Sequence, residues 1–230
     1  MRRSGNAETR RRQAEPPASA SEPTVQRRSP RAERTRARLL VAARKVFERQ
    51  GFVNARITDI AETAAVAIGS FYTYFRTKEE IFVALIYEME EELLRPHRDI
   101  ASSKNASIYG AVESANRDYL NTYQRNAALM AVLEEFSTLD DEFRTIRIRR
   151  GIAYQEPNIR SIRRLQERGI ADPELDAVLT AHSLGGMVSR AAYQAFVLET
   201  SDDIDQLVAT LTRLWLNALG IDQKFWSEPL

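Results

Sequence analysis

The sequence predicts an all-α protein, with an amino-terminal three-helix domain followed by a larger helical domain. Apolar residues recur at three- and four-residue spacing along almost the whole chain after Pro30, which is typical of amphipathic helices. No segment alternates apolar and β-branched residues with polar ones between turn signals, as a half-buried strand does. No internal repeat is evident, and 230 residues suffice to bury a sizeable core.

The amino-terminal helices follow from their boundary residues. The first begins after Pro30, buries Leu39, Ala43 and Phe47 on one face, and ends at Gly51. Short helices at about 58–64 and 68–75 are separated by a brief break at 65–67. A capping box over 77–80 opens a long helix, which should end near residue 94, before Pro96.

The rest of the chain alternates helices with short polar breaks. Pro157 is expected to kink or split one helix, and Asp172-Pro173 resembles a helix start, with a cap residue before proline. Ser201 opens the last helix, and Gly220 ends it. The expected helices span about 106–126, 127–139, 140–168, 173–198 and 201–219.

Composition excludes several classes of site. The chain has no cysteine, so disulfides, thiol catalysis and cysteine-based zinc sites are excluded. Its two histidines, His97 and His182, lie far apart in sequence, and we expect no metal site and no cofactor. The longest apolar runs are far too short to cross a bilayer, and no secretory signal follows Arg2-Arg3, so we expect a cytoplasmic protein without membrane contact.

The charge is unevenly distributed. Residues 1–80 hold 17 basic and 9 acidic side chains, whereas residues 81–230 hold 16 and 23. This asymmetry favours contact between the amino-terminal part and a polyanion, although a basic tail beside an ordinary domain would also produce it. Residues 1–30 are expected to form a disordered basic tail, which either adds attraction to phosphates or only aids solubility.

Residues 56–75 carry the pattern of a helix-turn-helix. On the second short helix, Phe71 and Phe75 are four residues apart and should pack inward. The opposite face holds small, hydroxylated and aromatic residues that can enter a major groove and donate to phosphates. Those residues are Gly69, Ser70, Tyr72, Thr73 and Tyr74.

Lys78 lies in the first turn of the following helix, where a cation opposes the helix dipole. A phosphate that bridges its ammonium and the free backbone N–H groups would explain this placement. The alternative is an exposed lysine that is tolerated at small cost.

Residues 33–93 resemble the DNA-binding domain of TetR-family transcriptional regulators. The resemblance covers about a quarter of the chain, whereas the remainder is similar only in length and helical character. The residues that carry it are Ala42, Ala43, Phe47, Gly51, Phe52, Ile57, Asp59, Ile60, Ala61, Val66, Gly69, Phe71, Tyr72, Tyr74, Phe75 and Lys78.

The resemblance implies roles by position. Tyr72 and Lys78 should hold phosphates, and Thr73 and Tyr74 should lie near base edges or backbone. Base contact is expected at the start of the recognition helix, and contact with the DNA backbone at the start of the preceding helix. The first group is Ile68, Gly69 and Ser70, and the second is Arg56 and Thr58.

Three positions depart from the family pattern. Arg56 and Ala67 stand where hydroxyl caps are usual, and Ala65 replaces a turn glycine whose backbone shape it must adopt. Arg56 either supplies a charged phosphate contact or is an ordinary exposed arginine.

The carboxy-terminal domain, residues 94–230, is expected to bind an effector and to dimerise. The last two helices offer an apolar stripe and a small-residue patch for a four-helix interface, although the stripe could instead face its own core. The expected interface residues are Leu179, Ser183, Gly186, Leu207, Leu211 and Trp215. The expected pocket residues, each with a core role as its alternative, are Phe82, Tyr119, Tyr123, Met130, Tyr154 and Met187.

Two further patterns can be explained without a functional site. Residues 181–186 resemble the nucleophile elbow around a catalytic serine, but they follow a helical pattern instead of the strand that this motif requires. The arginines of 144–164 could attract an acidic ligand, although a solvated helix face explains them as well.

The sequence therefore predicts no enzyme but a homodimeric regulator of transcription that binds double-stranded DNA at a palindromic operator. We expect a repressor that an unidentified small apolar or amphipathic molecule releases. A hydrolase built on Ser183 and a helical adaptor with an acidic partner are the alternatives.

Overall fold

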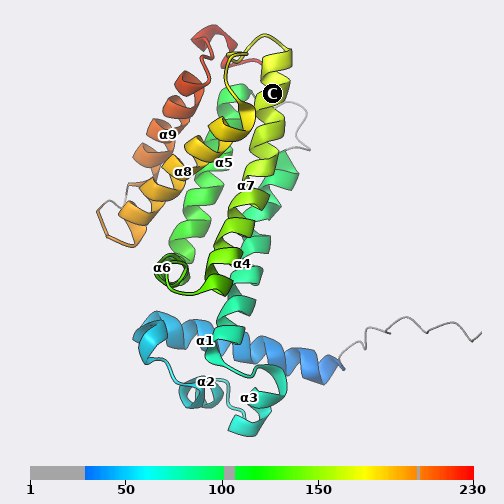
Figure 1. The fold of residues 1–230 in the computed structure, drawn as a ribbon, viewed down its shortest axis with the longest axis vertical. Helices are drawn as coiled ribbons and strands as arrows, with labels where there is room; N and C mark the ends of the chain where they lie inside the picture. The colour runs from blue at the N-terminus through cyan, green and yellow to red at the C-terminus, as the bar shows by residue number, and fades with distance from the viewer. Residues whose placement is uncertain (1–28, 101–106, 201–202) are drawn as a thin grey trace, which may run out of the picture.

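The computed structural model describes residues 29–100, 107–200 and 203–230, and it describes residues 90–100 by their backbone alone. Within this part the regular elements are helices, with one isolated bridge between Ser107 and Pro229, so the all-α prediction is confirmed (Figure 1). Almost all of the expected basic tail, residues 1–30, and the expected helix start at Ser201 lie outside the described residues.

A small amino-terminal unit is joined to a larger bundle by one long helix. In Figure 1, α1, α2 and α3 form the lower unit, and α4 runs from it into the bundle, with α6 at the junction. The first four helices are α1 (Pro30–Asn54), α2 (Ile57–Thr63), α3 (Ile68–Tyr74) and α4 (Lys78–Ile100). The bundle holds α5 (Ile108–Arg125), α6 (Ala127–Phe136), α7 (Asp141–Glu167), α8 (Ala177–Phe196), α9 (Ile204–Ala218) and the short 3-10 helix η1 (Gln223–Phe225).

The kink in α1 positions the first aromatic residue of the core. Ser29 caps the helix through a hydrogen bond from the backbone N–H of Ala32, with Pro30 in the first turn. Gly51 has φ +73°, a conformation that interrupts the helix as predicted. One more helical turn follows the kink, and it carries Phe52 into the buried core.

The predicted end of the long helix was wrong. α4 continues past Pro96 to Ile100, and the expected domain boundary at residues 93 and 94 falls inside it. A proline within a helix removes one backbone hydrogen bond, at a cost of about 3 kcal/mol. α7 likewise runs unbroken through Pro157, because the buried Ile159 and Ile162 that follow contribute roughly 1.5–3 kcal/mol each.

The predicted start of α8 was also wrong. Asp172-Pro173 forms a turn in which the Asp172 carboxylate accepts from the N–H of Glu174. The helix begins only at Ala177, where the Asp176 side chain caps the N–H of Leu179 at 2.7 Å. The sequence thus contains two possible acidic caps four residues apart, Asp172 and Asp176, and the helix starts after Asp176.

The final segment of the chain returns to the start of α5. Ile108 N–H donates to the Glu228 carbonyl at 2.7 Å, and Tyr109 N–H donates to the Trp226 carbonyl at 3.0 Å. The rings of Tyr109 and Trp226 lie 5.5 Å apart. These contacts satisfy backbone donors in the first turn of α5, which a helix leaves unpaired by itself.

Three helices end in the same hydrogen-bonded turn. Gly169 after α7 and Gly220 after α9 have positive φ, and the next residue donates back across the turn in each case. Ala65 occupies the equivalent position after α2 with φ +51°, and Val66 N–H donates to the Ala61 carbonyl at 3.0 Å. Ala65 therefore does adopt a backbone shape that glycine prefers.

We expect Ala65→Gly to raise the free energy of unfolding by about 1 kcal/mol, because a left-handed conformation costs roughly 1–2 kcal/mol with a Cβ and glycine returns part of this as chain entropy. Gly169→Ala is the reverse control: its Cβ would meet no atom within 4 Å, so only the positive φ opposes it. It should lower stability by a similar amount. Urea titrations followed by circular dichroism measure both changes, and a destabilised Ala65→Gly variant would contradict the assignment.

Candidate nucleic-acid interface and ligand cavity

The turn between α2 and α3 is held by an arginine from α1. The Arg38 guanidinium donates to the Ala64 carbonyl and, at 3.0 Å, to the Ala65 carbonyl. These are carbonyls at the end of α2, which a helix leaves without internal partners. Arg38 therefore fixes the turn that orients α3, a role with no local signal in the motif itself.

The predicted two-faced character of α3 is present in the structure. Phe71 and Phe75 are buried, and their ring centroids lie 5.9 Å apart. On the other side Tyr72 is 53% exposed and Ile68 is 46% exposed. Gly69 is exposed as well, and a Cβ there would meet no atom within 4 Å. α3 thus presents an open face to solvent on a rigid aromatic base.

The other predicted DNA contacts lie around this face. Arg56, Thr58 and Thr73 are exposed, whereas Ser70 and Tyr74 are half-buried. Neither Arg56 before α2 nor Ala67 before α3 makes a side-chain cap, as their residue types led us to expect. The structure does not test whether any of these side chains contacts DNA, and those roles stay predictions.

Lys78 makes contacts that the sequence did not reveal. Its ammonium donates to the carbonyls of Phe52, Val53 and Ala55, at 2.9, 3.0 and 3.3 Å, and lies 4.8 Å from the centroid of the Phe52 ring. Three donors thus satisfy the carbonyls at the end of α1, which the kink leaves exposed. In this arrangement Lys78 ties α4 to α1, and its predicted phosphate contact would compete with these three carbonyls.

An aromatic cluster connects the amino-terminal unit to the bundle. Its centre is Phe52, whose ring centroid lies 5.0 Å from Phe136 of α6 and 5.1 Å from Phe82 of α4. Phe82 in turn stacks on Phe143 of α7 at 5.3 Å. Phe82 was predicted to line a pocket, but it is fully buried in this cluster and lines neither cavity described below.

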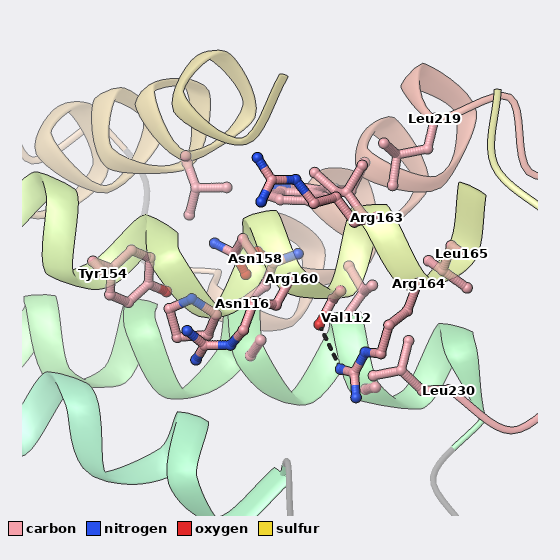
Figure 2. A pocket seen from close by; sticks show the side chains of 18 of the residues that line it. Val112, Asn116, Tyr154, Asn158, Arg160, Arg163, Arg164, Leu165, Leu219 and Leu230 are labelled. Atoms are coloured by element: carbon pink, nitrogen blue, oxygen red, sulfur yellow. Dashed lines mark hydrogen bonds between the residues drawn. The ribbon is translucent and has the colours of Figure 1, made fainter. Parts of the chain in front are cut away.

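Two adjoining cavities lie among α5, α7, α8 and α9, apart from a more open hollow between α4 and α7. The larger of the adjoining pair, of about 420 Å³, is lined by α5, α7, α8 and α9, and the smaller, of about 330 Å³, by α5, α7 and α8 (Figure 2 shows residues around the larger one). Both volumes fall in the range of small-molecule sites. Of the residues predicted to contact a ligand, Tyr154 lines both cavities and Tyr119 the smaller one, whereas Tyr123, Met130 and Met187 line neither.

Two tyrosines of the bundle, Tyr123 and Tyr154, stay neutral at physiological pH. Burial raises the pKa of Tyr123 well above its ordinary value, and burial raises the pKa of Tyr154 in the same direction. Both hydroxyls therefore remain able to donate a hydrogen bond.

The predicted interface residues divide into two groups. Leu179, Ser183 and Gly186 are exposed along one face of α8, with Leu179 69% exposed. Leu211 and Trp215 are buried in their own chain, which favours the alternative of a stripe that faces its own core, and Leu207 is half-buried. The stripe packs against α5 instead, because a helix with so many apolar residues first fills the core of its own chain. Val178 of α8 and Leu214 of α9 are likewise exposed.

Several alternative sites find no support in the described residues. Ser183 lies in the middle of the continuous helix α8, not at the strand-to-helix turn of a nucleophile elbow. The described part of the chain holds no group of three or more metal-ligating side chains. It also holds no helix long and apolar enough to span a membrane.

The comparisons agree with this architecture. Residues 39–85 match the family model described as bacterial regulatory proteins of the tetR family. The chain is similar to the HTH-type transcriptional regulator EthR of Mycolicibacterium smegmatis, with 26% identity over 187 residues, which cover 80% of this chain and 85% of EthR. It is also similar to the regulator TtgR of Pseudomonas putida, with 25% identity over 81% of this chain and 93% of TtgR.

Among solved structures, the fatty acid degradation regulator FadR from Bacillus halodurans superposes with a TM-score of 0.68 at 21% identity, covering 86% of this chain and all of that one. The relatives are transcriptional regulators and not enzymes, which leaves the hydrolase alternative without support. Residues 39–85 thus match the TetR-family model, and in its fold and over most of its length this chain is similar to DNA-binding transcriptional regulators of that family.

Proposed function

We propose that this protein is a homodimeric repressor that binds a near-palindromic operator and leaves it when a small molecule occupies the bundle. One observation carries the proposal. The exposed face of α3 is built on buried Phe71 and Phe75, while the same amino-terminal unit packs through Phe52 on Phe143 of α7, a helix that lines both cavities.

The DNA side of the proposal rests on the exposed face of α3. Ile68, Gly69 and Thr73 would approach base edges, where small side chains permit close contact with the major groove. Tyr72 and Arg56 would reach phosphates on either side of that groove. Ser70, Tyr74 and Thr58 would support these contacts from the edge of the same surface.

The dimer side rests on the outer face of α8 and α9. Val178, Leu179 and Leu214 expose apolar surface there, and Ser183 and Gly186 would let a second helix approach closely. A second copy that packs its own α8 and α9 on this face would form a two-fold symmetric four-helix interface. Such a dimer presents two α3 helices to successive major grooves.

Release by a ligand would act through the junction between the two parts. A molecule in the bundle can shift the equilibrium only by its differential affinity for the DNA-bound and free geometries. Movement of α6 or α7 would reach Phe52 through Phe136 and Phe143, and would change the orientation of α1 and α3. When the spacing of the two α3 helices no longer matches that of successive major grooves, the dimer dissociates from the operator.

Selection of bound sequences from random duplex DNA by the full-length protein at physiological salt tests the proposal. We expect a near-palindrome whose half-sites are about one or more helical turns apart. Recovery of DNA without any preferred sequence would overturn it, because a helical adaptor with a basic front binds without sequence preference.

We expect Tyr72→Ala to weaken operator binding about tenfold or more, because it removes a hydrogen bond to a charged phosphate in each half-site. Its stability should not change, since the ring is 53% exposed. Tyr87→Ala is the matched control, as Tyr87 is an exposed tyrosine of α4, outside α3 and more than two helical turns beyond Lys78. Fluorescence anisotropy of labelled operator gives both affinities, and equal losses in the two variants would contradict the role of Tyr72.

We expect Lys78→Met to lower the free energy of unfolding by about 1–2 kcal/mol, because the α1 carbonyls lose their donors. The exposed Lys45→Met is the control and should leave stability unchanged. The salt dependence of operator binding then tests the phosphate contact. A lost phosphate contact lowers the slope of log K against log salt by about 1. An unchanged slope would restrict Lys78 to its structural role.

We expect Leu179→Lys to convert the dimer to monomers, because two ammonium groups would meet near the symmetry axis, and to weaken operator binding in parallel. Leu139→Lys is the matched control, since Leu139 is 75% exposed at the turn after α6 and Leu179 is 69% exposed. Sedimentation equilibrium measures the mass of each variant. A dimer that survives Leu179→Lys would refute this face as the interface.

A further inference from the structure

Two buried N–H groups in the bundle lack an acceptor among the described residues. They are Nε1 of Trp215, on α9, and Nε of Arg150, on α7. Trp215 is only 7% exposed and lines the larger cavity, whereas Arg150 lines the smaller one. Buried donors in proteins almost always have a partner, and an unpaired one costs roughly 1–3 kcal/mol. Each nitrogen is closed to solvent, so an acceptor atom of a bound molecule would satisfy it once the side chain turns toward the cavity that it lines.

The walls around Trp215 are largely apolar. Ala111 and Val112 of α5, Ile162 of α7 and Val188 of α8 line the larger cavity together with Leu219. An apolar chain inside would replace water against these side chains, at about 25 cal/mol for each Å² of apolar surface removed from water.

The charges that line the larger cavity are mostly positive. Arg160, Arg163 and Arg164 lie on its α7 side, against a single acidic residue, Glu167. Arg160 pairs with Glu156 at 3.2 Å, and Arg164 donates to the Ser161 hydroxyl at 3.1 Å. Arg163 makes no ion pair within the described part of the chain, and Figure 2 places its guanidinium on the opposite side of α7 from that of Arg164.

The two cavities adjoin at one place. Tyr154 and Gly185 line both of them. A Cβ at position 185 would overlap the side-chain amide of Gln155, so a glycine there lets this amide lie directly against α8. At Gly186, the next residue along the helix, a Cβ would meet no atom within 4 Å. The contact between Gln155 and Gly185 therefore shapes the boundary between the larger and the smaller cavity.

We propose that the larger cavity binds an anionic amphiphile, an apolar chain ending in one carboxylate, whose oxygen accepts a hydrogen bond from Trp215 Nε1 and whose charge is balanced by Arg163. This assignment rests on the proposed function, since it names the class of molecule that releases the operator. A cationic amphiphile is rejected by the same site, because an ammonium offers no acceptor to the indole N–H and is repelled by Arg163.

Isothermal titration calorimetry of the full-length protein with decanoate, decanol and decylamine tests the charge preference. We expect decanoate to bind at least tenfold more tightly than decanol, and decylamine to bind more weakly than either. Decanoate binding should weaken as salt rises, since its partner Arg163 is exposed to solvent. Equal affinity for decanoate and decylamine would overturn the proposal.

Two variants test the named groups. Trp215→Phe keeps an aromatic ring and removes the donor, and Arg163→Gln removes the charge. Trp215→Phe should weaken decanoate binding about tenfold or more, as expected for a lost hydrogen bond to a carboxylate, and Arg163→Gln about two- to fivefold, as expected for an ion pair exposed to solvent. Arg144→Gln is the matched control, because Arg144 is an exposed arginine of α7 that lines neither cavity and pairs with Asp141. Wild-type affinity in both Trp215→Phe and Arg163→Gln would overturn the assignment.

A parallel titration with operator-bound protein separates this inference from the proposed function. Decanoate that binds with the expected dependence on Trp215 and Arg163, but leaves DNA bound, supports the cavity and overturns release by its occupant. Release by decanol or decylamine, without decanoate binding, keeps the repressor mechanism and overturns the anionic ligand.

Discussion

The position of Phe52 determines how the two parts of this protein are joined. Gly51 breaks α1 with a positive φ, and the next residue enters a cluster with Phe82, Phe136 and Phe143, one ring from each of α4, α6 and α7. Aromatic pairs of this geometry contribute about 0.5–1.5 kcal/mol each beyond the burial of their area. The amino-terminal unit is therefore packed against the bundle, in addition to being connected to it by α4.

Cations from neighbouring helices cap the carboxyl ends of α1 and α2, whereas the starts of α2 and α3 have no side-chain cap. Arg38 satisfies the carbonyls that end α2, and Lys78 those that end α1. Neither α2 nor α3 has a side-chain cap at its start, and Ala65 holds a turn that glycine would hold with less strain. The orientation of α3 thus depends on contacts between helices more than on the motif's own sequence. A substitution on α1 can therefore alter DNA recognition without touching α3.

Local signals in the sequence predicted most of the fold, whereas long-range contacts escaped it. Helix periodicity and glycine stops placed nearly every element, because these are properties of neighbouring residues. The continuation of α4 past Pro96 depends on the helix around that proline. The periodicity of apolar residues does not show whether this helix can tolerate the proline. Likewise, Phe82 and Trp215 are apolar residues whose partners lie on other helices, so the sequence could not tell a junction or a core from a pocket or an interface. The exposed face of α3 was predictable because its two sides differ within eight residues.

The tryptophans of the chain, Trp215 and Trp226, both belong to the bundle, and residues 31–89 contain none. Intrinsic emission excited at the red edge of the indole band therefore reports on the cavity and the final segment, and it is blind to the recognition helix itself. A change in that emission when DNA is added therefore reports that the bundle has responded to binding at the amino-terminal unit. The unmodified protein thus carries a built-in optical probe of communication between its two parts.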